Sequence, residues 1–205
     1  MLAKFFAVVC FLIQVSAFAE KLPEPKVDYS ADGTMEAQSM SMTYKVYATQ
    51  GKQRQVMGDD GMVTIMRKDK NVIWQLMPEK MYMEMPMQKG AANDPSLMDI
   101  QEKKAMGSEI VNGIKTTKYK VIATTKDGKK FGGHFYISAE DITVKMDMLL
   151  IDGKEKTRIV TELKKLNIGK QNPSLFELPP GYQKFSMGGM PGMPNMKDMM
   201  KGMHE

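Results

Sequence analysis

The sequence of 205 residues contains very little cysteine and histidine. Cys10 is the only cysteine, and His134 and His204 are the only histidines. No serine or cysteine lies in the context of a nucleophile elbow, and His134 sits among glycine and phenylalanine on an expected strand, where a structural role is favoured over a base. The sequence therefore predicts that the protein is not an enzyme.

Long apolar runs are absent after the first segment of the chain. That segment has a basic start at Lys4, an apolar run over 5–15 that is too short to span a bilayer, and the small-x-small pattern Ala17-Phe18-Ala19. We predict a signal peptide over 1–19, cleaved after Ala19, and a periplasmic location. Because Cys10 lies inside this segment, the exported protein would contain no cysteine and would be held by its core alone.

Charge of one sign does not gather in a patch. The net charge is +5 and the isoelectric point about 9.1, but lysine, aspartate and glutamate are interspersed along the chain. Without a platform of basic and aromatic residues, nucleic acid is excluded as a partner. We expect a monomer.

What the sequence does contain is a succession of short alternating segments separated by turn residues. Between Arg54 and Met87, turns at 58–61, 68–71 and 78–79 separate four expected strands. Further strands are expected over 27–35, 40–48, 109–111, 114–125, 130–137, 142–151 and 156–166. Asn112-Gly113 is a strong hairpin signal.

Two segments of the chain favour helix. Asp94-Pro95 is typical of a helix start, which predicts a helix from Ser96 to Met106. A single helical turn is expected over 172–177. The fold class predicted is mainly β: a strongly curved antiparallel meander of about ten or eleven strands, a half-barrel over 20–185, with one or two short helices.

The order of these segments resembles a known family. It is carried by Met62-Val63-Thr64-Ile65, Val72-Ile73-Trp74-Gln75-Leu76-Met77-Pro78, Val111-Asn112-Gly113-Ile114 and Asn172-Pro173-Ser174-Leu175-Phe176-Glu177-Leu178-Pro179-Pro180-Gly181-Tyr182. Together they resemble the half-barrel superfamily of the outer-membrane lipoprotein carrier and its receptor (LolA/LolB-type), and within it a DUF4412-like branch of unknown function. The resemblance implies an acyl chain held in the concave face of the sheet, and an outer-membrane or lipoprotein component as a partner. The chain departs from the carrier because it lacks an N-terminal amphipathic helix and an arginine placed as a lid latch.

Methionine is abundant, with 23 residues. Met is unbranched and polarizable, so a surface lined with it adapts to flexible apolar chains. Candidate residues for binding a lipid or other hydrophobic ligand are Met40, Met42, Tyr44, Trp74, Met81, Met83 and Met85. The alternative is that these residues fill an ordinary core, which is the commoner reason for an alternating apolar face.

The last residues, 186–205, are rich in Met, Gly and Pro and are expected to be a disordered tail. In an extended chain with three residues per turn, methionines at every third position form one row, and thioethers select Cu(I) or Ag(I). The candidate ligands are Met187, Met190, Met193, Met196, Met199, Met200, Met203 and His204. Two other readings remain open: a tail without a ligand, and a tail that absorbs oxidant through reversible sulfoxide formation.

Overall fold

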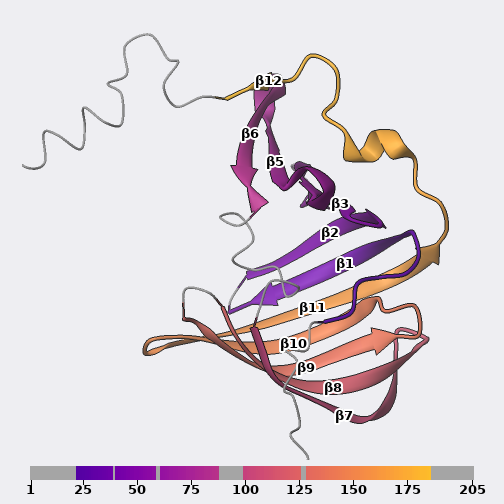
Figure 1. Ribbon diagram of the computed structural model, residues 1–205, viewed down its shortest axis with the longest axis vertical. Helices are drawn as coiled ribbons and strands as arrows, with labels where there is room; N and C mark the ends of the chain where they lie inside the picture. Colours follow the sequence, from indigo (N-terminus) through magenta and orange to yellow (C-terminus); the bar gives the residue numbers. More distant parts are fainter. Residues whose placement is uncertain (1–21, 39, 59–60, 88–98, 126–127, 186–205) are drawn as a thin grey trace, which may run out of the picture.

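A computed structural model describes residues 22–38, 40–58, 61–87, 99–125 and 128–185 of the chain. Strands make up 69% of the described residues and form a single open, curved sheet (Figure 1). The predicted mainly β class is confirmed. The predicted strand number is wrong, because the sheet has 12 strands, and the last of them is a two-residue strand that the sequence pattern does not distinguish from a loop.

The strands follow one another in short hairpins. They are β1 (Tyr29–Ala37), β2 (Met40–Thr49), β3 (Lys52–Met57), β4 (Met62–Arg67), β5 (Val72–Met77), β6 (Met81–Pro86), β7 (Asp99–Val111), β8 (Ile114–Thr124), β9 (Lys130–Ser138), β10 (Thr143–Asp152), β11 (Glu155–Ile168) and β12 (Gln183–Lys184). In the described part of the chain, three 3-10 turns accompany them, η1 (Lys68–Lys70), η2 (Pro78–Lys80) and η4 (Pro173–Phe176). Among the described residues, no helix is long and apolar enough to cross a membrane.

The sheet consists of two meanders that meet in the middle. Its strand order is β12-β6-β5-β4-β3-β2-β1-β11-β10-β9-β8-β7. The first meander runs from β1 out to β6, and the second runs from β7 at the far edge back to β11. The two join where β1 pairs antiparallel with β11, with Tyr29 opposite Ile168 and Ala37 opposite Ile159. All neighbours are antiparallel except β12, which lies parallel to β6.

The tight turns follow from residues that tolerate a left-handed backbone. Asn112 and Gly113 have φ values of 49° and 80°, as the two-residue hairpin between β7 and β8 requires. Asn71 has a φ of 54° and closes the turn between β4 and β5. The predicted hairpin at Asn112-Gly113 and the predicted helical turn over 172–177 are both confirmed.

The predicted helix from Ser96 to Met106 is wrong over 99–106. This stretch belongs to β7, which pairs with β8 along its length from Asp99 opposite Thr124 to Val111 opposite Ile114. Residues 88–98, including the predicted cap Asp94, lie outside the described residues. The apolar stripe of this segment was narrow, so pairing with β8 outweighs its moderate helix propensity.

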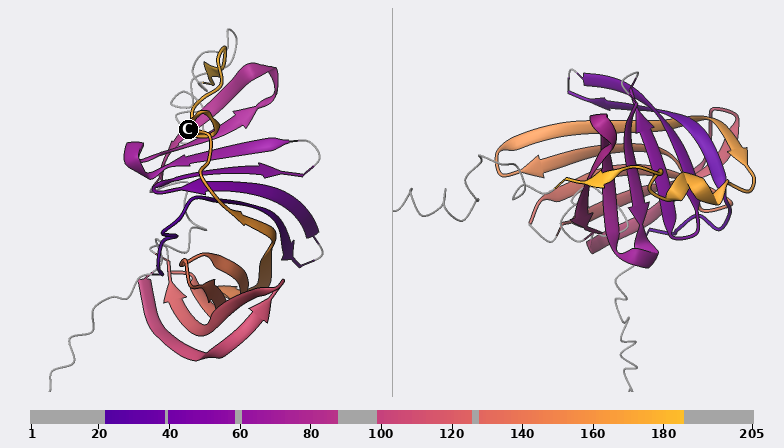
Figure 2. Two further views of the ribbon diagram at one scale, coloured as in Figure 1. Left: turned by 90° about the vertical axis from the view of Figure 1, so that its right-hand side faces the viewer. Right: turned by 90° about the horizontal axis from the view of Figure 1, so that it is seen from above.

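The sheet curls most strongly over its second meander, β7 to β11 (Figure 2). Glycines permit this curl: a Cβ at Gly133 in β9 would clash with the backbone of Asp147 and Met148 in β10. Side chains on one side of these strands pack into a buried cluster, namely Leu22, Ile100, Val121, Ala123, Phe131, Phe135, Ile137 and Met148. Because side chains converge only on the inner side of a curl, this cluster marks the inner side of the sheet.

Candidate functional site

The strands of the first meander carry their methionines on a single face. Residues directly opposite each other on paired strands point to the same side of a sheet, and the side alternates along each strand. The directly paired residues Met35–Met42, Met57–Met62 and Met77–Met81 therefore share a side. Continuing the register places on this side Met35, Met40, Met42, Met57, Met62, Met66, Met77, Met81, Met83 and Met85. We call this surface of β1 to β6 the methionine face.

The segregation of methionine is complete within these strands. Every methionine of β1 to β6 lies on the methionine face, and Met87, directly after β6, packs against Ile73 of that face. The opposite face of the same strands holds branched and aromatic side chains instead, among them Ile65 and Leu76. A core filled without regard to residue type would mix these kinds of side chain on both faces.

The methionine face also carries no charged side chain anywhere on β1 to β6. The residues that complete it are Tyr29, Ala31, Gly33, Ala37, Tyr44, Val46, Ala48, Gln53, Gln55, Thr64, Ile73 and Gln75. Because 26% of the whole chain is charged, the absence of charge from a face six strands wide sets it apart from the rest of the surface.

A row of hydrogen-bonding groups crosses the methionine face. The pairs Gln55–Thr64 and Thr64–Gln75 place these three residues side by side on β3, β4 and β5. The Thr64 hydroxyl donates a hydrogen bond of 2.7 Å to the Gln75 side-chain carbonyl, and the Gln75 amide donates to the Val63 carbonyl at 3.2 Å. The face is therefore amphiphilic, with neutral polar groups between methionines.

Exposure changes along the strands of the methionine face. At one end Val46, Ile73 and Met87 are buried. At the other end the side chains of Met40 and Met62 are 63% and 56% exposed. Large apolar side chains are thus open to solvent at one end of a face that is closed at the other.

Tyr44 occupies the middle of the methionine face near β1. Its ring lies directly over Gly33 of β1, where a Cβ would clash with the ring, so glycine is required at this position. Burial raises the pKa of the Tyr44 hydroxyl to about 12. Burial, with a smaller contribution from Tyr44, likewise raises the pKa of Tyr29 to about 12.

The methionine face is continuous with the inner side of the curled second meander. A single row of paired residues runs across seven strands: Met42, Met35, Thr161, Met146, Phe135, Tyr119 and Ala105. Phe135 belongs to the inner cluster, which Tyr119 and Met146 contact. The predicted methionine surface therefore lies on the same side of the sheet as the closed core of the second half.

The opposite face of the first meander is covered by residues 173–182, which we call the C-terminal segment. Leu178 and Tyr182 pack on a cluster of Ile65, Trp74 and Leu76, and the segment crosses this face in Figure 2. The buried Arg67 holds the segment in place.

The Arg67 guanidinium forms two hydrogen bonds to Asp69, at 2.8 and 2.7 Å. It also donates to the Phe176 carbonyl at 3.0 Å and to the Glu177 carboxylate at 2.6 Å. Hydrogen bonding from Arg67 lowers the pKa of Asp69 to about 2.

Six of the seven predicted ligand-binding residues lie on the methionine face: Met40, Met42, Tyr44, Met81, Met83 and Met85. Trp74 does not, because it pairs with Glu84 and donates a 3.0 Å hydrogen bond to it on the opposite face. The sequence reasoning missed Met35, Met57, Met62, Met66 and Met77. Counting residues between the strands would have found them, because four residues separate Met57 from Met62 in the sequence and these two methionines pair.

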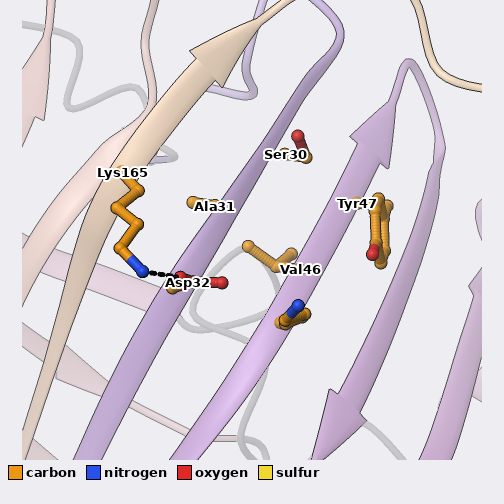
Figure 3. Close-up of a pocket in the computed structure, with 7 residues that line it drawn as sticks. Ser30, Ala31, Asp32, Val46, Tyr47 and Lys165 are labelled. Atoms are coloured by element: carbon orange, nitrogen blue, oxygen red, sulfur yellow. Dashed lines mark ion pairs between the residues drawn. The ribbon is translucent and has the colours of Figure 1, made fainter.

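A small pocket of about 240 Å³ lies between β1, β2 and β11 (Figure 3). Its lining is mostly polar, with Ser30, Asp32, Lys45 and Tyr47 projecting from the face opposite the methionines. Lys165 forms an ion pair of 3.0 Å with Asp32 across it. Hydrogen bonding to Lys165 lowers the pKa of Asp32. This pocket does not suit an apolar ligand.

The predicted metal ligands of the tail, from Met187 to His204, lie outside the described residues. Within the described residues, no group of three or more His, Cys, Asp or Glu side chains could hold a metal ion. Any metal in this part of the chain would have to rely on other donors.

Comparison with known proteins gives similarities of fold alone. No family model matches this chain, and no curated protein does. Among solved structures, MucB of the Pseudomonas aeruginosa MucA/MucB complex is 13% identical, with 75% of this chain and 56% of that chain covered and a TM-score of 0.42. The chain thus spans a little over half the length of MucB.

Two further solved structures show a similarity of fold of the same kind. Lipoprotein LppX from Mycobacterium tuberculosis is 14% identical, with 67% of this chain and 86% of that chain covered and a TM-score of 0.38. A domain described as an outer-membrane lipoprotein-sorting protein, from Vibrio parahaemolyticus, is 10% identical, with 74% and 90% covered and a TM-score of 0.39. The description of the Vibrio domain matches the lipoprotein-carrier class that the sequence resembles. The narrower DUF4412-like branch stays a prediction.

Proposed function

We propose that this protein is a non-enzymatic carrier that binds an amphiphilic ligand, with a long apolar chain and an uncharged polar group, on the methionine face. The observation that supports the proposal is the segregation itself: ten methionines and no charge on one face of six strands. Unbranched thioether side chains can re-pack around chains of different shape, whereas the opposite face, built from branched and aromatic residues, serves fixed packing.

The row of hydrogen-bonding groups that crosses the methionine face indicates the polar part of the ligand. Gln55, Thr64 and Gln75 offer amide and hydroxyl groups in the middle of the face, suited to an ester, amide or hydroxyl group. A carboxylate or ammonium buried there would meet no opposite charge, and an unpaired buried charge is costly. The ligand group that contacts the face is therefore neutral.

The predicted signal peptide over 1–19 supports a binding function outside the cytoplasm, in the periplasm. There a lipid or lipoprotein component of the envelope is the natural source of such a ligand. The amphiphile would enter at the end of the face where Met40 and Met62 are exposed, because that is where apolar surface meets solvent.

Native mass spectrometry with monooleoylglycerol as the probe tests the proposal. The variant Met40→Lys/Met62→Lys places two charges on the exposed end of the methionine face, so affinity should fall by at least about tenfold, which corresponds to about 1.4 kcal/mol. Both side chains are largely exposed, so folding should be unaffected.

The matched control is Ser41→Lys/Thr43→Lys. These residues are exposed neighbours on β2 that point to the opposite face, so the control should bind the probe as the unaltered protein does. Equal loss of binding in both variants, or no binding by the unaltered protein, would refute the proposal. Oleate, the anionic counterpart of the probe, should bind more weakly than monooleoylglycerol.

A second candidate function concerns the tail. The spacing of Met187, Met190, Met193 and Met196 supports a Cu(I) or Ag(I) binding function carried by residues 186–205. A chain that ends at Lys184 should keep monooleoylglycerol binding and lose metal binding if the tail alone holds the metal. Retention of all bound metal by the shortened chain would refute this alternative.

A further inference from the structure

The exposed end of the methionine face carries a row of four methionines on four adjacent strands. Met57 of β3 pairs with Met62 of β4, and Met77 of β5 pairs with Met81 of β6. The pair Val63–Leu76 between β4 and β5 fixes the register so that Met62 and Met77 are the next residues opposite each other. We call Met57, Met62, Met77 and Met81 the methionine row.

From this row we propose a soft-metal site in the folded sheet, which binds a monovalent Cu(I) or Ag(I) ion through two or three adjacent thioether sulfurs. Side chains directly opposite on neighbouring strands have Cβ atoms about 4.5–5.5 Å apart. A methionine side chain has three rotatable bonds beyond its Cα. Adjacent sulfurs of the row can therefore turn toward one ion without movement of the backbone.

The composition of the row and its surroundings selects the metal. Thioethers are soft, neutral donors that favour Cu(I), whereas Mg²⁺ and Ca²⁺ require hard oxygen donors. The methionine face of β1 to β6 offers no carboxylate for such ions. A monovalent ion is also the least costly charge to place on an uncharged surface.

Position in the sheet separates this row from the methionines used for packing. Met66, Met85 and Met87 form a cluster with Ile73 at the closed end of the face, so their side chains are committed to the core. Met62 is 56% exposed and the other three members of the row are partly exposed. An ion can reach the row directly from solvent.

The proposed site shares the methionine face with the proposed carrier function, but it depends on the sulfur atoms themselves. Leucine keeps the apolar character and approximate volume of methionine but removes the sulfur. The variant Met62→Leu/Met77→Leu should therefore lose the soft-metal site while the face keeps its apolar character.

The experiment titrates the full chain, labelled with ¹³C at the methionine methyl groups, with silver nitrate and follows each methyl resonance by NMR. Single Met→Leu variants assign the signals. We expect the methyl signals of Met62 and Met77 to shift together with that of Met57 or Met81, and the affinity of that event to fall by at least about tenfold in Met62→Leu/Met77→Leu. The matched control Met66→Leu/Met85→Leu alters two methionines of the same face and should retain it.

Three results would overturn the proposal. Shifts confined to the methionines of residues 186–205 would place the metal in the tail alone. Equal losses in the row variant and in the control would show that no discrete site exists. Unshifted methyl signals for the row in the presence of excess Ag(I) would show that its sulfurs do not bind soft metal.

Discussion

Replacing Arg67 by methionine tests whether one buried guanidinium secures the C-terminal segment over the opposite face. The Arg67 side chain is 4% exposed, whereas its partners Asp69 and Glu177 are 43% and 48% exposed. Methionine preserves much of the length and the apolar stem of arginine, but it gives up the cation–π contact of the guanidinium, whose carbon lies 5.8 Å from the centroid of the Trp74 ring. The substitution therefore removes mainly hydrogen bonds.

The expected loss of unfolding free energy depends on which hydrogen-bond partner of Arg67 is left without access to water. The Phe176 carbonyl accepts a buried hydrogen bond from Arg67, and leaving it unsatisfied costs about 1–3 kcal/mol. The two carboxylates are exposed enough to be rehydrated, so each ion pair adds only about 0–1 kcal/mol. The free energy of unfolding should fall by about 1–5 kcal/mol in total, a large share of the 5–15 kcal/mol typical of such domains.

Urea unfolding followed by the fluorescence of Trp74, the single tryptophan, measures this loss. Hydrogen exchange over Pro173–Tyr182 should show faster exchange in the variant. Arg158→Met is the matched control, because Arg158 makes the same two hydrogen bonds to a carboxylate, at 2.8 and 2.7 Å from Asp147, but is 67% exposed. Its loss should stay below about 1 kcal/mol. Equal losses in the two variants would refute the reasoning.

Two further predictions concern the centre of the methionine face. With pKa values of about 12, Tyr29 and Tyr44 stay neutral in the folded protein at a pH at which tyrosines of the unfolded chain, with a pKa of about 10, ionise. The stability that the two residues contribute is full below about pH 10 and is lost as the pH rises through about 12. Absorbance of tyrosinate should therefore show a late step, reduced in Tyr44→Phe, and a single step near pH 10 would contradict this. Gly33→Ala should destabilise the fold by about 1–3 kcal/mol because the new methyl group meets the Tyr44 ring, whereas Gly132→Ala, with open space around it, should be neutral in the same thermal melt.

Local sequence signals were sufficient for the hairpins and for the alternation of methionine. Asn112-Gly113 requires a tight turn, and Met81, Met83 and Met85 alternate with Tyr82 and Glu84, so both features can be read from a few neighbouring residues. The error on Trp74 arose from grouping residues by hydrophobicity. Its pairing with Glu84 places it on the face opposite the methionines, and only the register shows this.

The features that could not be predicted depend on distant parts of the chain. The pairing of β1 with β11 joins residues from opposite ends of the sequence, and no local pattern encodes it. The segment Asp99–Met106 has moderate helix propensity but becomes strand because β8 offers a complete row of partners. Tertiary context thus decided both outcomes.

The junction of β1 and β11 also fixes the order in which the protein can be completed. A chain emerges from the ribosome with its N-terminus first, so β1 and β2 are available long before β11 exists. Until then one side of β1 presents unpaired backbone groups, a template for pairing with the wrong partner, and contacts so distant in sequence form slowly. The first strand to be synthesised, β1, is therefore among the last to be paired on both sides, and it lies in the middle of the completed sheet.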